Sequence, residues 1–444
     1  MRRTTITIWF ILLITAVNYA QNDPNAKWSA HFQFTVIAQK HSGFRSSYAG
    51  LNSLADSVEP AATSLTSTLY LARRLWKGAS LYFNPEISGG KGLSYTKGVA
   101  GALNGETYRV GAVEPEVFVA RAYLRQYFAL PGSEYEYVKD DANQLGEKEP
   151  LNRIVISAGK FAISDFFDDN AYSKDPRTQF CNWSIWANGA WDYPANTRGY
   201  TEGVVVELIK PNWAIRLSTV AVPRIANYHL MEYKLFKAHS ETLEFEHNFS
   251  VLKRPGKFLL FVSNSDERSP SYKDGIEAIA NNNTFLLNVI AGNAENNTYG
   301  GKKTGLGLNV EQPVSENTGM FLRAGWNDGK YASWAFTEID NTVCIGFSSK
   351  GSAWHRSDDV WAIAAVTNGI SKDHMEFLKD GGYGFIIGDG KLNYGRESII
   401  ETYYSAKAGR FLWLTFDYQF VKDPAYNKDR GPVHVFAARV HVEF

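Results

Sequence analysis

The last thirteen residues of the chain, PVHVFAARVHVEF, constrain its fold more than any other segment. Counted back from Phe444 to Phe436, every second side chain is apolar, whereas the positions between include Glu443, His441 and Arg439. A period of two with one apolar face predicts a β-strand. A chain that ends on such a strand and an aromatic residue is typical of the closing strand of a transmembrane β-barrel. A half-buried strand of a soluble β-sandwich is the alternative that this segment leaves open.

The start of the chain predicts export. Two arginines precede an apolar run at 6–17, and Ala20 provides a small residue for cleavage. Because Gln21 rather than a cysteine follows, lipid attachment at this point is not indicated. We expect residues 1–20 to be a signal peptide and residues 21–444 to form a single barrel domain.

Composition and charge narrow the function. The chain has 46 basic and 46 acidic residues, so loss of the two arginines of the signal leaves a formal charge of −2. This balance gives no long-range field that would attract nucleic acid or strongly select ions of one sign, and neutral solutes become the expected cargo. No later apolar run is long enough for a transmembrane helix, so strands must make any membrane crossing. Aromatic residues at 14% suit barrel strands with aromatic girdles.

Segments of bilayer-spanning length recur along the chain with partial alternation of apolar and polar residues. In 241–249, Leu243 and Phe245 oppose Glu244 and Glu246, so the charged face must contact water. We predict an all-β protein, a transmembrane antiparallel barrel of about sixteen strands with infolded loops that narrow the pore. The predicted strands are 27–40, 64–75, 79–87, 116–128, 153–161, 201–210, 212–220, 241–249, 256–264, 304–311, 318–326, 342–349, 359–368, 397–406, 410–421 and 433–443.

The connections between these segments support a barrel. Those after the second, sixth, tenth and fourteenth segments are a few residues long, whereas those between them tend to be long. Short periplasmic turns opposite long external loops are the rule for outer-membrane barrels. Residues 129–152 break this pattern, because a long acidic connection stands where a short turn is expected.

The longest polar insertion, residues 159–200, combines acidic residues and arginines with several tryptophans. Such a loop is expected to fold inward, pack on the barrel wall and narrow the pore. Charged side chains that make bidentate hydrogen bonds, set beside flat aromatic rings, suit the hydroxyl rim and C–H faces of sugars. In the alternative interpretation, the tryptophans fasten the loop and the charges pair into a rigid plug. The candidate pore-lining residues of this loop are Asp165, Asp168, Asp169, Arg177, Trp191, Asp192 and Arg198.

A second candidate stretch, residues 103–128, leads into the fourth predicted strand. Its candidate pore-lining residues are Glu106, Arg109, Arg121 and Arg125. Opposed acidic and basic side chains across a lumen set selectivity through a transverse field, although an ordinary solvated wall would look the same in sequence. Alternation also places Phe118 and Ala120 on the lipid-facing side of this strand.

Enzyme and metal motifs are weak or absent. The chain contains no HExxH, GxSxG or P-loop pattern, and its nine histidines are scattered. We expect no cofactor and no catalysis. The rival hypotheses are an outer-membrane barrel hydrolase, for which Ser240 and His247 lack a third partner, and a barrel that binds or exports polysaccharide. The cysteines Cys181 and Cys344 could pair in an oxidising compartment but are expected to be incidental.

With these stretches in view, the chain resembles the carbohydrate-selective porins of Gram-negative outer membranes, the OprB family. The similarity covers roughly residues 64–444, and WDYPANTRG and DRGPV are its most specific motifs. The stretches that carry it are FNPEISGGKGLS (83–94), LNGETYRVG (103–111), VARAYLRQYF (119–128), GKFAISDFFDDNAYSKDPRTQF (159–180), NGAWDYPANTRGY (188–200), the span from Gly305 through FLRAGWNDGK (321–330), GGYGFIIGDGKLNYGRE (381–397) and DPAYNKDRGPVHVFAARVHVEF (423–444).

This resemblance implies a sixteen-stranded, monomeric barrel in the outer membrane that admits mono- and small oligosaccharides by passive diffusion. It implies that Glu106, Arg109, Arg121 and Arg125 belong to the constriction and that residues 165–198 form the infolded loop. It also implies a short helix at 271–280, small sugars and outer-membrane lipids as partners, and no nucleic-acid partner.

Overall fold

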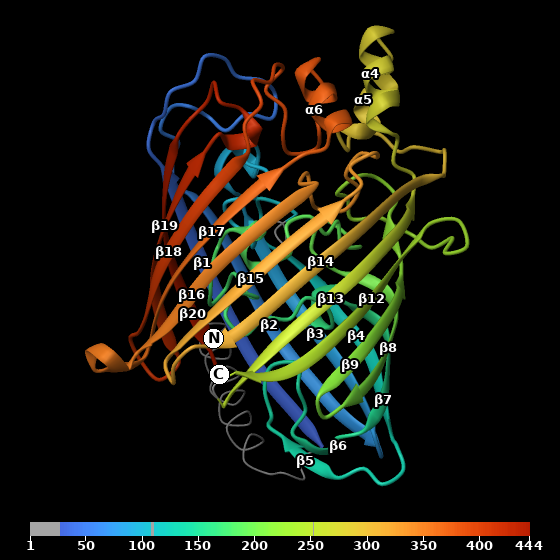
Figure 1. Ribbon diagram of the computed structural model, residues 1–444, viewed down its shortest axis with the longest axis vertical. Helices are drawn as coiled ribbons and strands as arrows, with labels where there is room; N and C mark the ends of the chain where they lie inside the picture. Colours follow the sequence, from blue (N-terminus) through green and yellow to red (C-terminus); the bar gives the residue numbers. More distant parts are fainter. Residues whose placement is uncertain (1–26, 108–110, 252) are drawn as a thin grey trace, which may run out of the picture.

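The computed structural model describes residues 27–107, 111–251 and 253–444. The predicted signal peptide 1–20 and the candidate Arg109 therefore lie outside the described residues. Within them, sixteen strands close into one antiparallel barrel, in which each barrel strand pairs with the next along the chain and β20 pairs with β1 (Figure 1).

All sixteen predicted strands are confirmed, with ends that differ by a few residues. The barrel strands are β1 (Trp28–His41), β2 (Ala62–Trp76), β3 (Ala79–Gly90), β4 (Glu116–Ala129), β7 (Arg153–Phe161), β8 (Thr201–Lys210), β9 (Trp213–Val220), β12 (His239–Val251), β13 (Arg254–Glu267), β14 (Gly301–Pro313), β15 (Thr318–Asn327), β16 (Asn341–Gly351), β17 (Arg356–Gly369), β18 (Glu397–Lys407), β19 (Leu412–Lys422) and β20 (Val433–Glu443).

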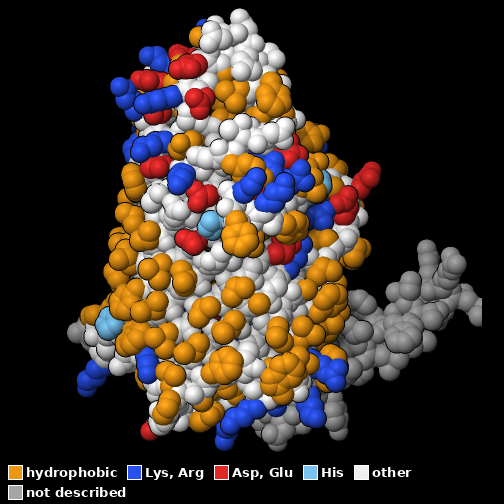
Figure 2. All heavy atoms as spheres, turned by 90° about the vertical axis from the view of Figure 1, so that its right-hand side faces the viewer, with side chains coloured by type: hydrophobic (Ala, Val, Ile, Leu, Met, Phe, Trp, Pro, Cys, Tyr) orange, Lys and Arg blue, Asp and Glu red, His pale blue; other side chains and the backbone are white. Residues whose placement is uncertain are grey.

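Alternation along the strands gives the wall an apolar outside and a polar inside. On β20, Phe436 and Val440 are exposed while Arg439 and His441 are buried. Hydrophobic side chains cover a broad band of the outer surface, and charged side chains gather beyond it (Figure 2). The described residues contain no helix long and apolar enough to span a membrane. The apolar outer band of the strands (Figure 2) is the surface that a bilayer requires.

Strand β4 departs from simple alternation. Its register with β3 slips by one residue at Ala120, which has no partner on β3. A β-bulge of this kind moves the preceding residues to the opposite faces. Val117 and Val119 are exposed, whereas Ala120 is buried and Phe118 packs against it. The prediction that Phe118 and Ala120 face lipid is therefore wrong, while Arg121 and the residues after it face inward as predicted.

One end of the barrel carries short turns and the other carries long loops with helices (Figure 1). The helix expected at 271–280 is confirmed as α4 (Tyr272–Ala280), where the Ser271 side chain accepts a hydrogen bond from the Asp274 N–H. α4 packs with two other loop helices, α5 (Thr284–Ile290) and α6 (Lys372–Lys379). The remaining short elements are η1 (Leu93–Tyr95), η2 (Ile163–Asp165), α3 (Trp183–Trp186), β10 (Val222–Pro223), β11 (Met231–Glu232), η3 (Ser352–Trp354) and η4 (Pro424–Tyr426).

The long connection 129–152 contains a separate hairpin, β5 (Tyr135–Val138) paired with β6 (Glu147–Pro150). The hairpin lies at the end with the short turns (Figure 1). Its length follows from this extra element, which the sequence pattern did not predict.

The main apolar core lies inside the barrel. Trp183, Trp191 and Phe167, all from the 162–200 connection, are buried in one cluster with the wall residues Tyr123 and Phe261. We call residues 162–200 the infolded loop. Packing of these aromatic side chains holds the loop across the lumen, as the sequence predicted.

Candidate functional site

Trp191 anchors the infolded loop to the wall. Its ring lies 4.8 Å from the ring of Phe261 on β13 and 6.3 Å from that of Phe167. Only 2% of Trp191 is exposed. The structure therefore places this candidate in a packing contact, and its burial corresponds to the fastening role that the sequence left as an alternative.

Asp192 joins the infolded loop to the loop between β15 and β16. Its carboxylate oxygens accept hydrogen bonds from the N–H groups of four consecutive residues, Trp334 to Thr337, at 2.7–3.2 Å. The Lys303 ammonium group lies 3.3 Å away and is equally buried. A carboxylate that satisfies so many donors fixes the local backbone.

Asp168 and Asp169 are neighbours in sequence with different surroundings. The buried Asp168 accepts from the Arg323 guanidinium at 3.1 Å and from the Asn309 amide at 2.7 Å. The Asp169 side chain is 42% exposed and pairs with Lys174 and Lys257, each at 2.5 Å. Desolvation opposes ionisation of Asp169, but the two ammonium groups outweigh it and hold its pKa well below the usual range.

Arg177 ties the infolded loop to the first strands of the barrel. Its guanidinium contacts Glu106 and Glu86, each at 3.0 Å, and donates to the Gln33 side chain at 2.9 Å. Glu86 projects from β3 and Glu106 from the connection after it, and all three charged side chains are buried. This network brings the candidates Arg177 and Glu106 together in a buried cluster in which the cation of Arg177 offsets the charge of the carboxylates.

Two arginines of β4 point into the lumen. Arg121 makes a bidentate pair with Asp165 of the infolded loop, with both N–O distances at 2.7 Å. Arg125 makes a second bidentate pair with Glu149 of the β5–β6 hairpin, at 2.6 and 3.0 Å. Such forked pairs hold hydrogen-bond donors and acceptors in fixed directions.

Arg198 lies apart from these pairs. Its guanidinium contacts Glu116 at the end of β4 and stacks 4.1 Å from the Phe118 ring. The bulge at Ala120 makes this contact possible, because it turns Phe118 inward.

Among the described residues, hollows lie on more than one side of the infolded loop. The first, which we call the charged cavity, has a volume of about 770 Å³ and borders Arg121, Arg125, Asp165 and Asp169. A second cavity of about 590 Å³ lies against β15–β20 and borders Arg177. A third, of about 320 Å³, lies among the external loops and includes Thr107 and Thr197. Four of the candidate residues therefore meet around one space of a size that holds small molecules.

Sequence reasoning missed several residues of the charged cavity. Arg153, Glu207 and Arg216 project into it from β7, β8 and β9. Each is a charged residue within a strand of membrane-spanning length, and that signal alone indicates a lumen-facing position. Glu149 carried no such signal, because its hairpin was not predicted.

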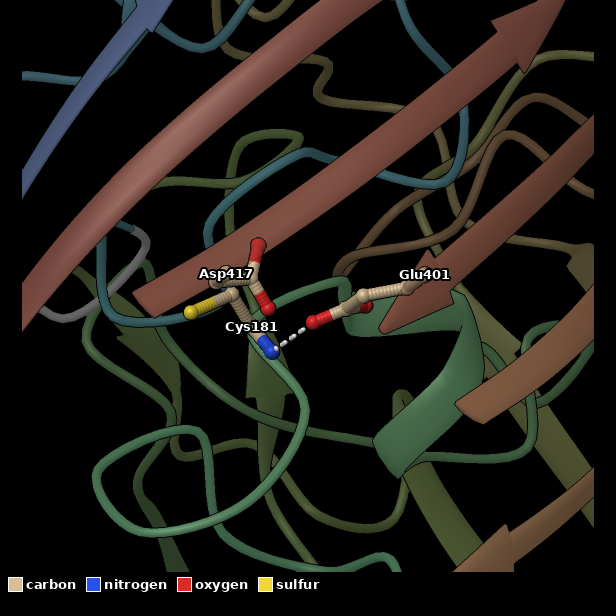
Figure 3. Close-up of side chains that lie close together, drawn as sticks. All are labelled: Cys181, Glu401 and Asp417. Atoms are coloured by element: carbon tan, nitrogen blue, oxygen red, sulfur yellow. Dashed lines mark hydrogen bonds between the residues drawn. The ribbon is translucent and has the colours of Figure 1, made fainter. Parts of the chain in front are cut away.

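The Cys181 backbone fastens the loop to a further wall strand, β18 (Figure 3). Glu401 on β18 accepts from the N–H groups of Cys181 at 2.5 Å and Asn182 at 3.0 Å, and Asp417 on β19 lies beside them. These residues are the group of potential metal ligands that comes together in the described part of the chain. We assign no metal to it, because Glu401 is occupied by backbone donors and the Arg439 guanidinium lies 3.6 Å from the Cys181 sulfur. Burial also raises the pKa of the Cys181 thiol well above its usual value.

Cys181 and Cys344 are both buried free thiols, so no disulfide joins them. The pair considered for a hydrolase is also separated. Ser240 is buried and bonds to Ser265, whereas His247 is exposed on the outer face of the same strand. Because the barrel wall lies between the two side chains, they cannot act as a nucleophile and base.

Comparison with known proteins decides the family. The model of the carbohydrate-selective porins, the OprB family, matches residues 61–444. The chain belongs to this family. It is therefore an outer-membrane porin for carbohydrates and not an enzyme, as the sequence predicted.

One solved structure supports the barrel fold, and two further channels are reported for their weaker similarity. The high-pH structure of Pseudomonas putida OprB is similar at a TM-score of 0.67 and 14% identity, over 94% of each chain. The outer membrane channel DcaP of Acinetobacter baumannii has a TM-score of 0.49 and 10% identity, over 95% of this chain and 98% of DcaP. Salmonella typhi OmpF has a TM-score of 0.49 and 8% identity, over 94% of this chain and 97% of OmpF. No curated protein is similar enough to count as a match.

Proposed function

We propose that this porin conducts neutral mono- and small oligosaccharides passively, and that the charged cavity is part of their path. The observation that carries the proposal is the pairing of Arg121 with Asp165 and of Arg125 with Glu149 around one cavity of about 770 Å³. Acidic and basic side chains alternate around the cavity, so the lining offers many hydrogen-bond groups without strongly selecting ions of one sign.

Aromatic side chains complete the sugar-compatible lining. Tyr82 and Tyr123 stack with ring centroids 4.7 Å apart, and Phe166 lies edge-on to Tyr123 at 6.1 Å. All three border the charged cavity. Flat rings next to hydrogen-bonding groups match the two kinds of surface that a pyranose presents.

The other candidate residues take different places in this proposal. Arg198 and Glu106 belong to the constriction on the external side, while Asp168, Trp191 and Asp192 hold the loop in position. Arg109, which lies outside the described residues, stays a candidate for the constriction without a place in the structure. We further propose a monomeric barrel contacting outer-membrane lipids, a cleaved signal peptide at 1–20 and one domain over 21–444. A polysaccharide exporter would require a wider lumen than a barrel filled by the infolded loop provides.

Liposome swelling tests the function. Purified protein is reconstituted, and the rates for glucose, arabinose and maltose are compared with those for non-sugar solutes of matched size at equal osmolarity. Faster swelling with sugars supports the proposal. Rates ordered by size alone, or no swelling, would contradict it.

A further inference from the structure

The β5–β6 hairpin is hydrogen-bonded to the first three strands of the barrel. His31 on β1 contacts Asp140 of the hairpin at 3.1 Å, and Asn84 on β3 contacts Asn143 at 2.5 Å. Arg74 on β2 donates to the Gly146 carbonyl at 2.9 Å. The wall residues His31 and Asn84 are buried on the inner face of the barrel. The segment between β5 and β6 is therefore tucked into the mouth at the short-turn end.

Apolar packing reinforces these polar contacts. Leu145, between the two hairpin strands, is 3% exposed and belongs to the same apolar cluster as Tyr82 and Tyr123. A leucine buried against the lumen-facing aromatic stack stabilises the tucked position of the hairpin. At this position, where a barrel ordinarily has a short turn, sixteen residues from 135 to 150 are held over part of the opening.

The hairpin supplies one side of the charged cavity. Val138, Asn143, Leu145 and Glu149 border the cavity from the hairpin. Glu149 is the acidic centre of this side, because Arg125 lies 2.6 Å and Arg153 3.0 Å from its carboxylate oxygens. On the adjoining strands β8 and β9, Glu207 and Arg216 form a pair at 2.9 Å. Three ion pairs thus face a common volume of a size that holds a small ligand.

We propose that the hairpin and the wall behind it form a second saccharide-binding subsite, at the periplasmic mouth and separate from the external constriction. A sugar that has passed the infolded loop meets the Glu149–Arg125–Arg153 cluster and the Tyr82–Tyr123–Phe166 aromatic group before release. The hairpin sets the exit size, and Glu149 acts as a specificity-determining residue. This inference rests on the proposed passage of sugars through the charged cavity.

Planar-bilayer recordings with glucose or maltose added on one side test the subsite. Glu149→Gln keeps the size of the side chain but removes the charge that holds Arg125 and Arg153. It is expected to weaken sugar-dependent current block about tenfold, and to shift the zero-current potential in a KCl gradient towards chloride selectivity. Glu134→Gln is the matched control, since Glu134 is an exposed glutamate of the same connection that does not border the cavity.

A second variant does not depend on a single side chain. The Leu151 N–H donates to the Glu134 carbonyl at 2.8 Å, so residues 135–150 can be replaced by two glycines without separating the strands that they connect. This variant is expected to raise KCl conductance about twofold and to lose block by sugar from the periplasmic side.

The outcomes separate this inference from the proposed function. Block equal to wild type in both Glu149→Gln and the hairpin-free variant would overturn the subsite, as would sugar-driven liposome swelling without any block in the wild type. Absence of sugar-driven swelling in every variant would instead overturn the proposed function.

Discussion

The two sides of the infolded loop use the same residue types differently. On the side of the charged cavity, the side chains of Asp165 and Asp169 are 23% and 42% exposed and pair with side-chain cations. On the side of the wall, those of Asp168 and Asp192 are only 4% and 2% exposed, and Asp192 accepts hydrogen bonds from four consecutive backbone N–H groups. The difference teaches that the role of a carboxylate in a porin lumen depends on its burial and its partners. The first kind can exchange a partner for a solute, and the second holds the scaffold.

The largest expected effect is loss of a wall-side carboxylate. Asp192→Ala leaves four backbone donors and the Lys303 ammonium group buried without their acceptor. We expect a loss of about 3–5 kcal/mol in the free energy of unfolding, measured by urea denaturation with tryptophan fluorescence. Asp56→Ala, at an exposed position, is the control. A change below about 1 kcal/mol in Asp192→Ala would show that Asp192 is not a scaffold residue.

Next in size is a change on the cavity side. Arg121→Ala combined with Arg125→Ala removes both forked pairs of β4 and is expected to raise ion conductance about twofold and to blunt discrimination among sugars. Single-channel recording and liposome swelling measure the two effects. The control is Arg410→Ala, an exposed arginine in the turn before β19. Unchanged conductance and unchanged sugar permeation would remove both arginines from the path.

The buried carboxyl group of Glu338 predicts a pH dependence of the stability. Glu338, in the loop between β15 and β16, is buried and accepts from the Ile386 and Ile387 N–H groups at 2.9 Å each. Burial outweighs these donors and raises its pKa to about 8. Because the folded state holds this proton more tightly than the unfolded state, its stabilising contribution is complete below the ordinary carboxyl pKa. That contribution is lost as pH rises through about 8.

Stability measured from about pH 5 to about pH 9 should therefore fall in the wild type, and Glu338→Gln should flatten that fall. The same pH slope in wild type and variant would contradict the assignment.

The smallest expected effect concerns the exposed cavity-side pair. Asp169→Asn removes contacts with Lys174 and Lys257 from a side chain that is 42% exposed. Pairs of this kind contribute about 0–1 kcal/mol, so urea denaturation should show little change. The zero-current potential in a KCl gradient should nevertheless move towards chloride selectivity. A large loss of stability would place Asp169 with Asp168 and Asp192 on the scaffold side.

Much of the barrel could be predicted from sequence, because alternate residues of a membrane-spanning strand face lipid and lumen and differ in polarity. On β12, the apolar Leu243 lies on the outer face and the charged Glu244 on the inner face. The bulge at Ala120 could not be predicted, because no residue type in this strand marks the position at which the register slips. The slip exchanges the lumen-facing and lipid-facing positions of the residues before it. The contact of Arg177 with Glu86 could not be predicted either, because partners in a lumen are set by closure of the barrel and not by spacing along the chain.

The candidate site was predicted in part. The arginines of β4 and the acidic residues of the infolded loop were identified, and four of them meet at the charged cavity. Glu149 was missed because its hairpin interrupts the expected alternation of turns and loops. Asp192 and Trp191 were identified by residue type, but only the fold reveals that they are buried.

Thiol accessibility tests most directly whether the passage follows the cavity side of the infolded loop. In a Cys181→Ser/Cys344→Ser background, cysteines are placed at Thr178, which borders both large cavities, and at the buried Ala190. A charged methanethiosulfonate reagent is added during single-channel recording. The account predicts a stepwise loss of current for Thr178→Cys and no change for Ala190→Cys. Block at Ala190→Cys with none at Thr178→Cys would contradict it.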